Sequence, residues 1–128
     1  MKQVEILRKY REVEIQTSPP EKLIILLYDE AVKCLKMAIT KIKIKDIEQS
    51  NRLLLKTQKI IRELMCSLNV DVGEVAMGLY NLYEYIYERL VQANIEKNAQ
   101  IVEEVLSLIK PLREAWIKAA EVVNEDNN

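Results

Sequence analysis

The sequence predicts an all-α fold, an antiparallel four-helix bundle with a short N-terminal arm or helix and a kinked or broken last helix. Three observations support this fold class. Four segments repeat apolar residues at steps of three and four positions, which is the period of an amphipathic helix. The links between these segments are short, so consecutive helices should lie antiparallel. Only two glycines and three prolines occur in 128 residues, which suits long helices with few tight turns.

A single domain is expected, because 128 residues are enough to enclose one core. We divide it into an N-terminal arm at residues 1–16, a helical bundle at residues 17–120 and a frayed C-terminal tail at residues 121–128. The arm is mostly polar and carries no cap or turn signal, and Tyr10 and Ile15 are its natural apolar anchors. A frayed terminus is the alternative interpretation of the arm.

The first helix is expected from about Pro19 to about Lys43. Ser18 is the predicted N-cap, and Glu21, three residues later, can complete a capping box. Six consecutive apolar residues, Leu23–Tyr28, cover more than one helical turn. This helix is therefore either central in the domain or presents apolar surface to a partner. Its later half is rich in lysine, which suits a helix C-terminus or, alternatively, forms a basic patch for an acidic partner.

The second helix is expected to begin at the cap Asp46 and to end near Leu68. Asp71 and Glu74 resemble a second capping box, which would begin a third helix that ends at about Ala93 or Asn94. The third helix carries two adjacent apolar stripes, and one of them contains a row of tyrosines. Because a buried tyrosine needs a hydrogen-bond partner, such a row suits either a half-wet boundary or the edge of a core. The stripe with tyrosines is Ala76, Tyr80, Tyr83, Tyr87 and Val91.

The last helix is expected to begin at the cap Asn98 and to continue to about Ala119. Pro111 lies inside its apolar pattern. A proline in a helix interior removes one intrahelical hydrogen bond and crowds the carbonyl four residues earlier. We therefore expect a kink or a break near Lys110.

The residue inventory argues against most catalytic and ligand-binding classes. The chain has no histidine, which excludes Ser-His and Cys-His couples and metal sites built with imidazole. Its two glycines cannot form a glycine-rich phosphate loop. The only adjacent acid pairs are Asp29-Glu30, Glu103-Glu104 and Glu125-Asp126, and adjacent residues on a helix do not face one another, so none resembles a catalytic carboxylate pair. Arg52, Arg62, Arg89 and Arg113 could serve a buried anion site by residue type only. We expect no enzymatic activity and no cofactor or metal.

Charge and hydropathy limit the partners and the compartment. A net charge of −1 gives no global field that would attract nucleic acid. The longest apolar run is far too short to cross a membrane, and charged residues interrupt any candidate signal peptide. Cys34 and Cys66 lie within helical patterns and are interpreted as reduced, small apolar residues. These features favour a cytoplasmic protein with neither a nucleic-acid partner nor membrane insertion.

The first and third helices are apolar over wider arcs than a bundle of this length needs to bury. Surplus apolar surface usually marks an interface. An apolar groove between helices is suited to an amphipathic helix from a partner. The alternative is a structural or adaptor bundle that forms a homodimer or binds a folded partner through the same surface.

Three blocks of the sequence, in their order and spacing, match a known family. The first holds Tyr10, Ile15, Thr17-Ser18-Pro19 and the run Leu23 to Ala31. The second holds Glu63-Leu64, Ser67-Leu68-Asn69, Gly73-Glu74-Val75-Ala76, Leu79, Leu82 to Ile86, Arg89-Leu90 and Ala93-Asn94. The third is Leu112-Arg113-Glu114-Ala115-Trp116. On these blocks, over about residues 10–118, the chain resembles the FliS-type flagellin secretion chaperones.

The resemblance implies a cytoplasmic holding chaperone. Such a protein binds the disordered C-terminal region of flagellin, prevents premature polymerisation and keeps the subunit competent for flagellar type III export. The flagellar export gate is a candidate second partner. Two departures from the family's pattern are Val72-Gly73, where two glycines are common, and Gly78, where asparagine is common. Gly78 should cost roughly 0.8–1 kcal/mol of helix stability relative to alanine.

Two sets of residues are the predicted site. We expect a client-binding groove that includes Leu23, Leu27, Leu54, Ile61, Leu79, Tyr80, Tyr83 and Tyr87. The resemblance implies that the arm bearing Tyr10 and Ile15 covers part of this groove when the client is absent.

Overall fold

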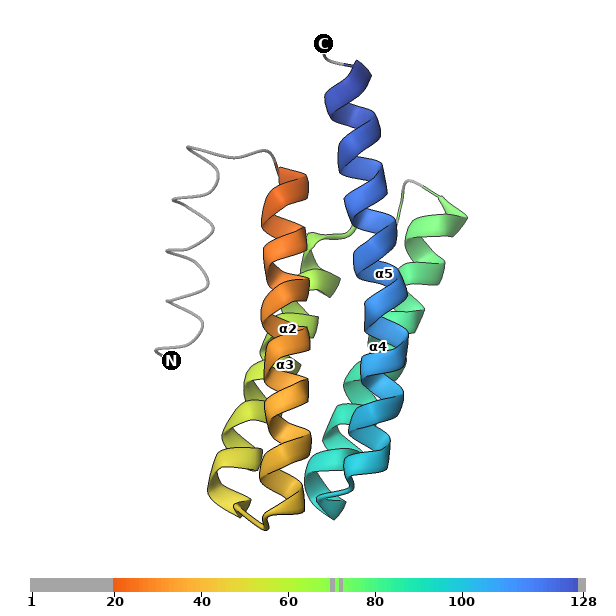
Figure 1. Ribbon diagram of the computed structural model, residues 1–128. Helices are drawn as coiled ribbons and strands as arrows, with labels where there is room; N and C mark the ends of the chain where they lie inside the picture. Colours follow the sequence, from red (N-terminus) through yellow and green to blue (C-terminus); the bar gives the residue numbers. More distant parts are fainter. Residues whose placement is uncertain (1–19, 70, 72, 127–128) are drawn as a thin grey trace.

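The computed structural model describes residues 20–69, 71 and 73–126, and within them the chain forms four α-helices and no strand (Figure 1). The helices are α2 (Pro20–Lys43), α3 (Ile47–Ser67), α4 (Glu74–Glu96) and α5 (Ala99–Asp126). The all-α prediction is therefore confirmed. The arm with Tyr10 and Ile15, and the Ser18 cap, lie outside the described residues.

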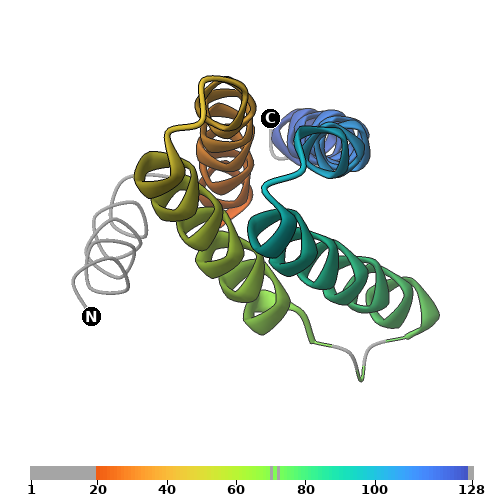
Figure 2. The ribbon, with the colours of Figure 1, turned by 90° about the horizontal axis from the view of Figure 1, so that it is seen from below.

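The four helices form a ring of antiparallel neighbours. α2 packs on α3, α3 on α4, α4 on α5, and α5 returns to pack on α2. Figure 2, a view along the bundle, shows the α2–α5 pair on one side and the α3–α4 pair on the other. This is the up-down-up-down arrangement that short links favour.

The turns between helices follow the expected caps in two places out of three. Asp46 accepts a hydrogen bond from the Gln49 amide at 3.1 Å. Asn98 accepts from the Gln100 amide at 2.9 Å, so both residues cap the helices that they precede. The capping box expected at Asp71 is wrong, because Gly73 is the N-cap of α4 and makes no side-chain bond. Gly73 has φ +146°, a conformation that favours glycine.

The core lies along the axis of the ring, and α2 is its central helix. Tyr28, Ala31, Leu35 and Ala38 are completely buried. Within the apolar run Leu23–Tyr28, three side chains are buried and three are half-buried. α2 needs this wide apolar arc because it packs on two neighbours, α3 and α5. Its apolar residues therefore serve the fold, as the interpretation of a central helix predicted.

α5 continues through Pro111 as a single helix to Asp126. The break expected near Lys110 does not occur, and the segment expected to be a frayed tail from residue 121 is helical as far as Asp126. An interior proline costs about 3 kcal/mol of helix stability. Ile109 before the proline is fully buried, and Leu112 and Trp116 after it pack against the core. This burial on both sides keeps the helix continuous.

Candidate functional site

Five of the eight predicted groove residues lie in the interior instead of at a surface. Leu54 and Ile61 are 0% exposed, Tyr83 is 1% exposed, and Leu23 and Leu27 are below 8%. Their positions on the helices face the axis of the ring, so other residues of the chain already cover them. The remaining three, Leu79, Tyr80 and Tyr87, are half-buried and line surface hollows.

Tyr83 belongs to a buried polar pair with Tyr28. The two hydroxyls are hydrogen-bonded to each other, and the ring centroids are 6.5 Å apart. Burial raises the pKa of Tyr28 far above its ordinary value, and the neighbouring Tyr83 adds to this shift. Burial also raises the pKa of Tyr83, while hydrogen bonds with Tyr28 and Trp116 act in the opposite direction. The pair joins α2 to α4 inside the core, so Tyr83 does not belong to the surface row that the sequence suggested.

The first hollow, called here the α3–α4 groove, has a volume of about 670 Å³. Apolar and sulfur-containing side chains make up most of its lining. Met77 is 45% exposed and Cys66 is also exposed, so these side chains are open to solvent. The complete lining is Arg62, Met65, Cys66 and Leu68 from α3 and its C-cap, and Met77, Tyr80, Glu84 and Tyr87 from α4.

Two lining residues of the α3–α4 groove, Arg62 and Tyr87, contact each other. Its guanidinium lies over the Tyr87 ring at 5.2 Å from the centroid, and Nη2 donates a hydrogen bond to the Tyr87 hydroxyl. A cation over an aromatic face is a weak attraction at an exposed site. Together the two contacts fix the Tyr87 ring in place across the α3–α4 contact.

A second hollow, called the α4–α5 hollow, adjoins the α3–α4 groove at Leu68, which lines both. Its volume is about 580 Å³, and Leu79 and Trp116 form part of its wall. Val75, at the start of α4, is 87% exposed beside it. Figure 2 shows why space remains here, because the end of α3 and the start of α4 diverge and a loop spans the distance. The first turns of α4 therefore carry apolar residues that have little of the bundle to pack against.

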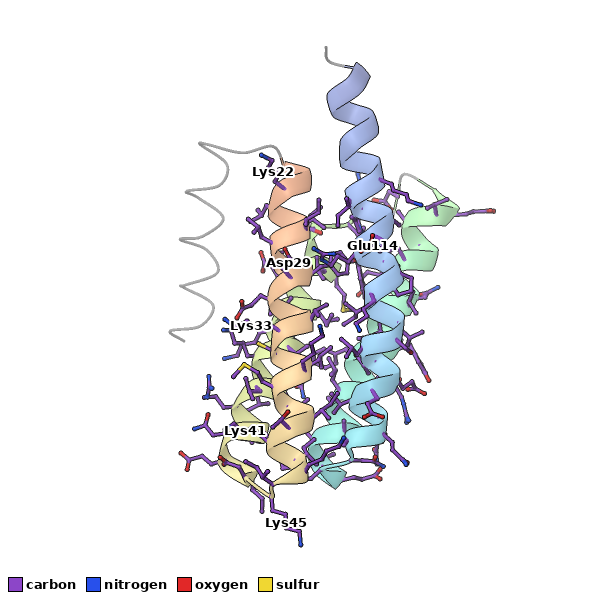
Figure 3. All side chains as sticks on the ribbon, in the orientation of Figure 1. Lys22, Asp29, Lys33, Lys41, Lys45 and Glu114 are labelled. Carbon is purple, nitrogen blue, oxygen red and sulfur yellow. The ribbon has the colours of Figure 1, made fainter. Side chains whose placement is uncertain are left out.

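A third hollow, the α2–α5 groove, is polar and has a volume of about 680 Å³. Arg113 of α5 is ion-paired with Asp29 of α2, and its Nη1 lies 3.1 Å from Oε1 of Glu114. These partners raise the pKa of the Arg113 guanidinium, the Asp29 hydrogen bond most of all. Figure 3 shows Asp29 and Glu114 at the same level of the bundle, on α2 and α5. Val32, Lys36, Ser107, Lys110 and Pro111 complete the lining.

Sequence reasoning missed most of the α3–α4 groove. The sequence predicts no groove role for Met65, Leu68, Met77 or Glu84. One signal could have indicated them, because the beginning of α4 is apolar on several sides instead of one. Cys66, expected to behave as a packed apolar residue, is exposed, whereas Cys34 is buried, and both thiols are free.

The four arginines proposed by residue type for an anion site are engaged at the surface. Arg89 is ion-paired with Glu104 at 2.8 Å, and Nε of Arg52 donates to Gln49 at 3.0 Å. Among the described residues, no group of three His, Cys, Asp or Glu side chains could hold a metal ion. Across the described helices, none combines the length and apolarity that a bilayer crossing requires.

Comparison with known proteins gives one consistent result. The sequence model of the family described as "Flagellar protein FliS" matches residues 3–123. The chain is 33% identical over 119 residues to the "Flagellar secretion chaperone FliS" of Bacillus subtilis, covering 93% of this chain and 89% of the relative. It is also 33% identical to the Salmonella typhimurium protein of the same name, with 86% of each chain covered. A solved structure described as a flagellar chaperone from bacteria has the same fold, with a TM-score of 0.75 at 20% identity, covering 92% of this chain and 97% of that one.

Proposed function

We propose, from the premise that this chain belongs to the FliS family of flagellar proteins, that it is a holding chaperone for flagellin. It acts in the cytoplasm, binds the disordered C-terminal region of flagellin, prevents premature polymerisation and keeps the subunit competent for flagellar type III export. Its curated relatives are named flagellar secretion chaperones, which supports a chaperone role in flagellar export. Flagellin as the client, and its C-terminal region as the bound part, are our inference.

The open, apolar α3–α4 groove is the observation that carries the proposal. Its lining offers Met65, Met77 and the tyrosine rings, together with the charged side chains of Arg62 and Glu84. Grooves of this kind take the apolar stripe of an amphipathic helix. Methionine side chains are flexible and adapt to the shape of the residue that contacts them. The groove therefore suits a client segment that becomes helical when it binds.

A disordered client loses conformational freedom on binding, which costs on the order of 2–5 kcal/mol or more. It must recover this cost by burying apolar surface over a long contact. The α4–α5 hollow extends the α3–α4 groove past Leu68 and exposes Val75 beside Leu79 and Trp116. The two hollows together offer a track longer than either one, which is what an unfolded client requires.

Calorimetry with the C-terminal region of the flagellin encoded in the same genome tests the proposal. We expect nanomolar to micromolar binding without nucleotide, and a negative heat-capacity change, because apolar surface is buried. Met77→Gln should weaken binding about tenfold, since a buried methionine contributes roughly 1.5–3 kcal/mol. Ile95→Gln is the matched control, because Ile95 is 74% exposed on the same helix but lines neither hollow.

Two results would contradict the proposal. One is the absence of binding to this flagellin region. The other is a stable dimer of the chain, measured by light scattering, that excludes the flagellin region. The second result would support the structural or adaptor role that the sequence left open.

A further inference from the structure

We propose that one end of the bundle attaches to the surface of a lipid bilayer that contains anionic lipids. This end, called here the lysine–isoleucine tip, holds the turns between α2 and α3 and between α4 and α5. The attachment does not depend on the client or on the hollows proposed to bind it. The residues that carry the inference are Lys43, Ile44, Lys45, Ile47, Ile95 and Lys97.

The two turns of the tip lie at the same end of the molecule. α2 and α4 end there and α3 and α5 begin there, and both turns face the viewer in Figure 2. Ile42, Lys45, Ile47 and Ser50 around the first turn line a hollow of about 300 Å³ together with Lys97 of the second. The two turns therefore form one continuous surface.

Three isoleucines of the tip are open to solvent. Ile44 is 63% exposed, Ile47 is 66% exposed and Ile95 is 74% exposed. Among the other described large apolar side chains, only Val75, at the opposite end of the bundle, is exposed to a similar or greater extent. Isoleucines this exposed add little to the core, and their transfer from water to the boundary of a bilayer is favourable.

Lysines are interleaved with these isoleucines. The stretch Lys41–Lys45 alternates lysine with isoleucine. Lys45, two residues after α2, has φ 61°, and Lys97, directly after α4, has φ 52°. Glycine is the common residue in this conformation, because it adopts it without steric cost. Both helices are thus followed by a lysine where the backbone favours glycine, and Figure 3 shows Lys45 pointing away from the bundle.

The carboxylates near the tip neutralise these lysines only in part. Asp46 uses its side chain to cap α3, and Glu96 accepts a hydrogen bond from a glutamine one turn earlier. Glu48 is exposed in the first turn of α3, where the helix dipole stabilises its charge. Glu103 lies 3.9 Å from Lys43, and because both side chains are largely exposed, this ion pair is weak.

The two lysines that follow helix ends keep their charge available. Within the described part of the chain, Lys45 takes part in no ion pair. Lys97 donates to the neutral side chain of Asn94. Burial lowers the pKa of Lys97, and no carboxylate opposes this effect. A lipid phosphate beside these two amines would supply the missing negative charge.

A bilayer fits the tip better than a second copy of the chain does. In a symmetric dimer the same surface would meet itself, so lysines would lie against lysines. An anionic bilayer offers phosphates at its surface and hydrocarbon beneath them, and it needs no complementary shape. The contact is peripheral, since none of the described helices could cross a bilayer.

Cosedimentation of the full-length chain with vesicles tests the proposal. The vesicles contain phosphatidylglycerol and phosphatidylcholine in equal parts, or phosphatidylcholine alone. We expect binding to the first kind that weakens as salt is added, and binding to the second that is about tenfold weaker or more. Each lysine near an anionic surface strengthens binding about fivefold.

Two double variants separate the contributions of charge and apolar surface. Lys45→Gln with Lys97→Gln should weaken binding about tenfold or more at low salt, and by less at high salt. Ile44→Gln with Ile95→Gln should weaken binding about tenfold at both salt concentrations, because salt does not screen apolar contacts.

The matched control for the lysine variant is Lys110→Gln with Lys118→Gln. These are exposed lysines farther along α5, so the change in net charge is the same but lies away from the tip. This variant should bind vesicles as the unaltered chain does. Melting curves of all variants, followed by circular dichroism, should coincide because the altered side chains lie outside the core.

Three results would overturn the proposal. One is the absence of binding to anionic vesicles, and another is equal binding to both kinds of vesicle. The third is binding of soluble polyglutamate, but not of vesicles, that the lysine variant loses, since the tip would then be a site for an acidic protein.

The proposed function is tested separately. Met77→Gln should bind anionic vesicles normally, and Ile95→Gln should bind the flagellin region normally when no lipid is present. Either proposal can therefore fail while the other stands.

Discussion

At the residue scale, the hydrogen-bonded pair of Tyr28 and Tyr83 is the feature with the clearest chemical consequence. Both rings are buried, and each hydroxyl has the other as its partner. A buried hydroxyl without a partner destabilises a fold, whereas a paired one is close to neutral. The pair therefore allows two large polar side chains inside a core that contains no phenylalanine.

Tyr28→Phe tests this pair through the pH dependence of stability. At neutral pH the change should cost about 1 kcal/mol, because the buried Tyr83 hydroxyl loses its hydrogen bond with Tyr28. The folded-state pKa of Tyr28 is raised by burial, so its contribution is complete below about pH 10, the unfolded pKa, and is lost as the pH rises above it. Urea unfolding at pH 7 and between pH 10 and 11 should show a shallower alkaline loss in the variant than in the unaltered chain.

The matched control for the neutral-pH cost is Tyr85→Phe, because Tyr85 is 44% exposed. It should change the free energy of unfolding at pH 7 by less than about 0.5 kcal/mol. If Tyr28→Phe and the unaltered chain lose the same unfolding free energy at alkaline pH, the two tyrosines are not a buried pair of neutral hydroxyls.

At the scale of the element, the two glycines near the start of α4 have different structural roles. Gly73 precedes the helix with φ +146°, and Gly78 lies inside it with nothing within 4 Å of the position a Cβ would take. Gly73 is thus required by the backbone, and Gly78 is not required by packing. The predicted cost of Gly78 is therefore a loss of helix stability alone, since a Cβ at this position would meet no neighbour.

Replacing each of the two glycines by alanine should change the free energy of unfolding in opposite directions. Gly78→Ala should stabilise the chain by about 0.8–1 kcal/mol, since alanine is the better helix former. Gly73→Ala should destabilise it by about 1–3 kcal/mol, because an L-residue rarely adopts that φ. Chemical unfolding monitored by circular dichroism measures both. A loss of stability in Gly78→Ala would show that the glycine has a packing role after all.

α5 shows how tertiary packing overrides a local signal. Pro111 predicts a kink or a break, and the helix nevertheless continues to Asp126. Packing of Leu112 and Trp116 against the core outweighs the loss of helix stability that Pro111 causes.

At the scale of the whole molecule, the ring of helices separates the residues that fold the chain from those that remain open to a partner. Three hollows lie between neighbouring helices: the α3–α4 groove, the α4–α5 hollow, which shares Leu68 with it, and the α2–α5 groove. The first two are largely apolar and the third is polar.

Removal of residues 1–15 tests whether the N-terminal arm competes with the client. Tyr10 and Ile15 are two apolar anchors on an otherwise mostly polar arm, so we expect the deletion to tighten client binding. Full-length chain with Tyr10→Ser and Ile15→Ser should change affinity in the same direction, which controls for the shortened chain. Weaker binding in both variants, measured by calorimetry, would show that the arm is part of the binding site.

The sequence by itself determined the helices, because their signals are local. The cap at Asp46, the cap at Asn98 and the apolar periods lie within a few residues of the features they specify. For the same reason the all-α bundle could be predicted without any contact between distant segments.

Only the tertiary structure decided which apolar residues fold the chain and which line a groove. In the sequence, Leu54, Ile61 and Tyr83 recur at the same helical spacing as groove residues such as Tyr80. The structure nevertheless buries these three side chains, because the rotation of each helix in the ring turns them to the core. The groove itself arises where α4 diverges from the end of α3. That divergence depends on how helices from distant parts of the chain pack together, and no local pattern in the sequence records it.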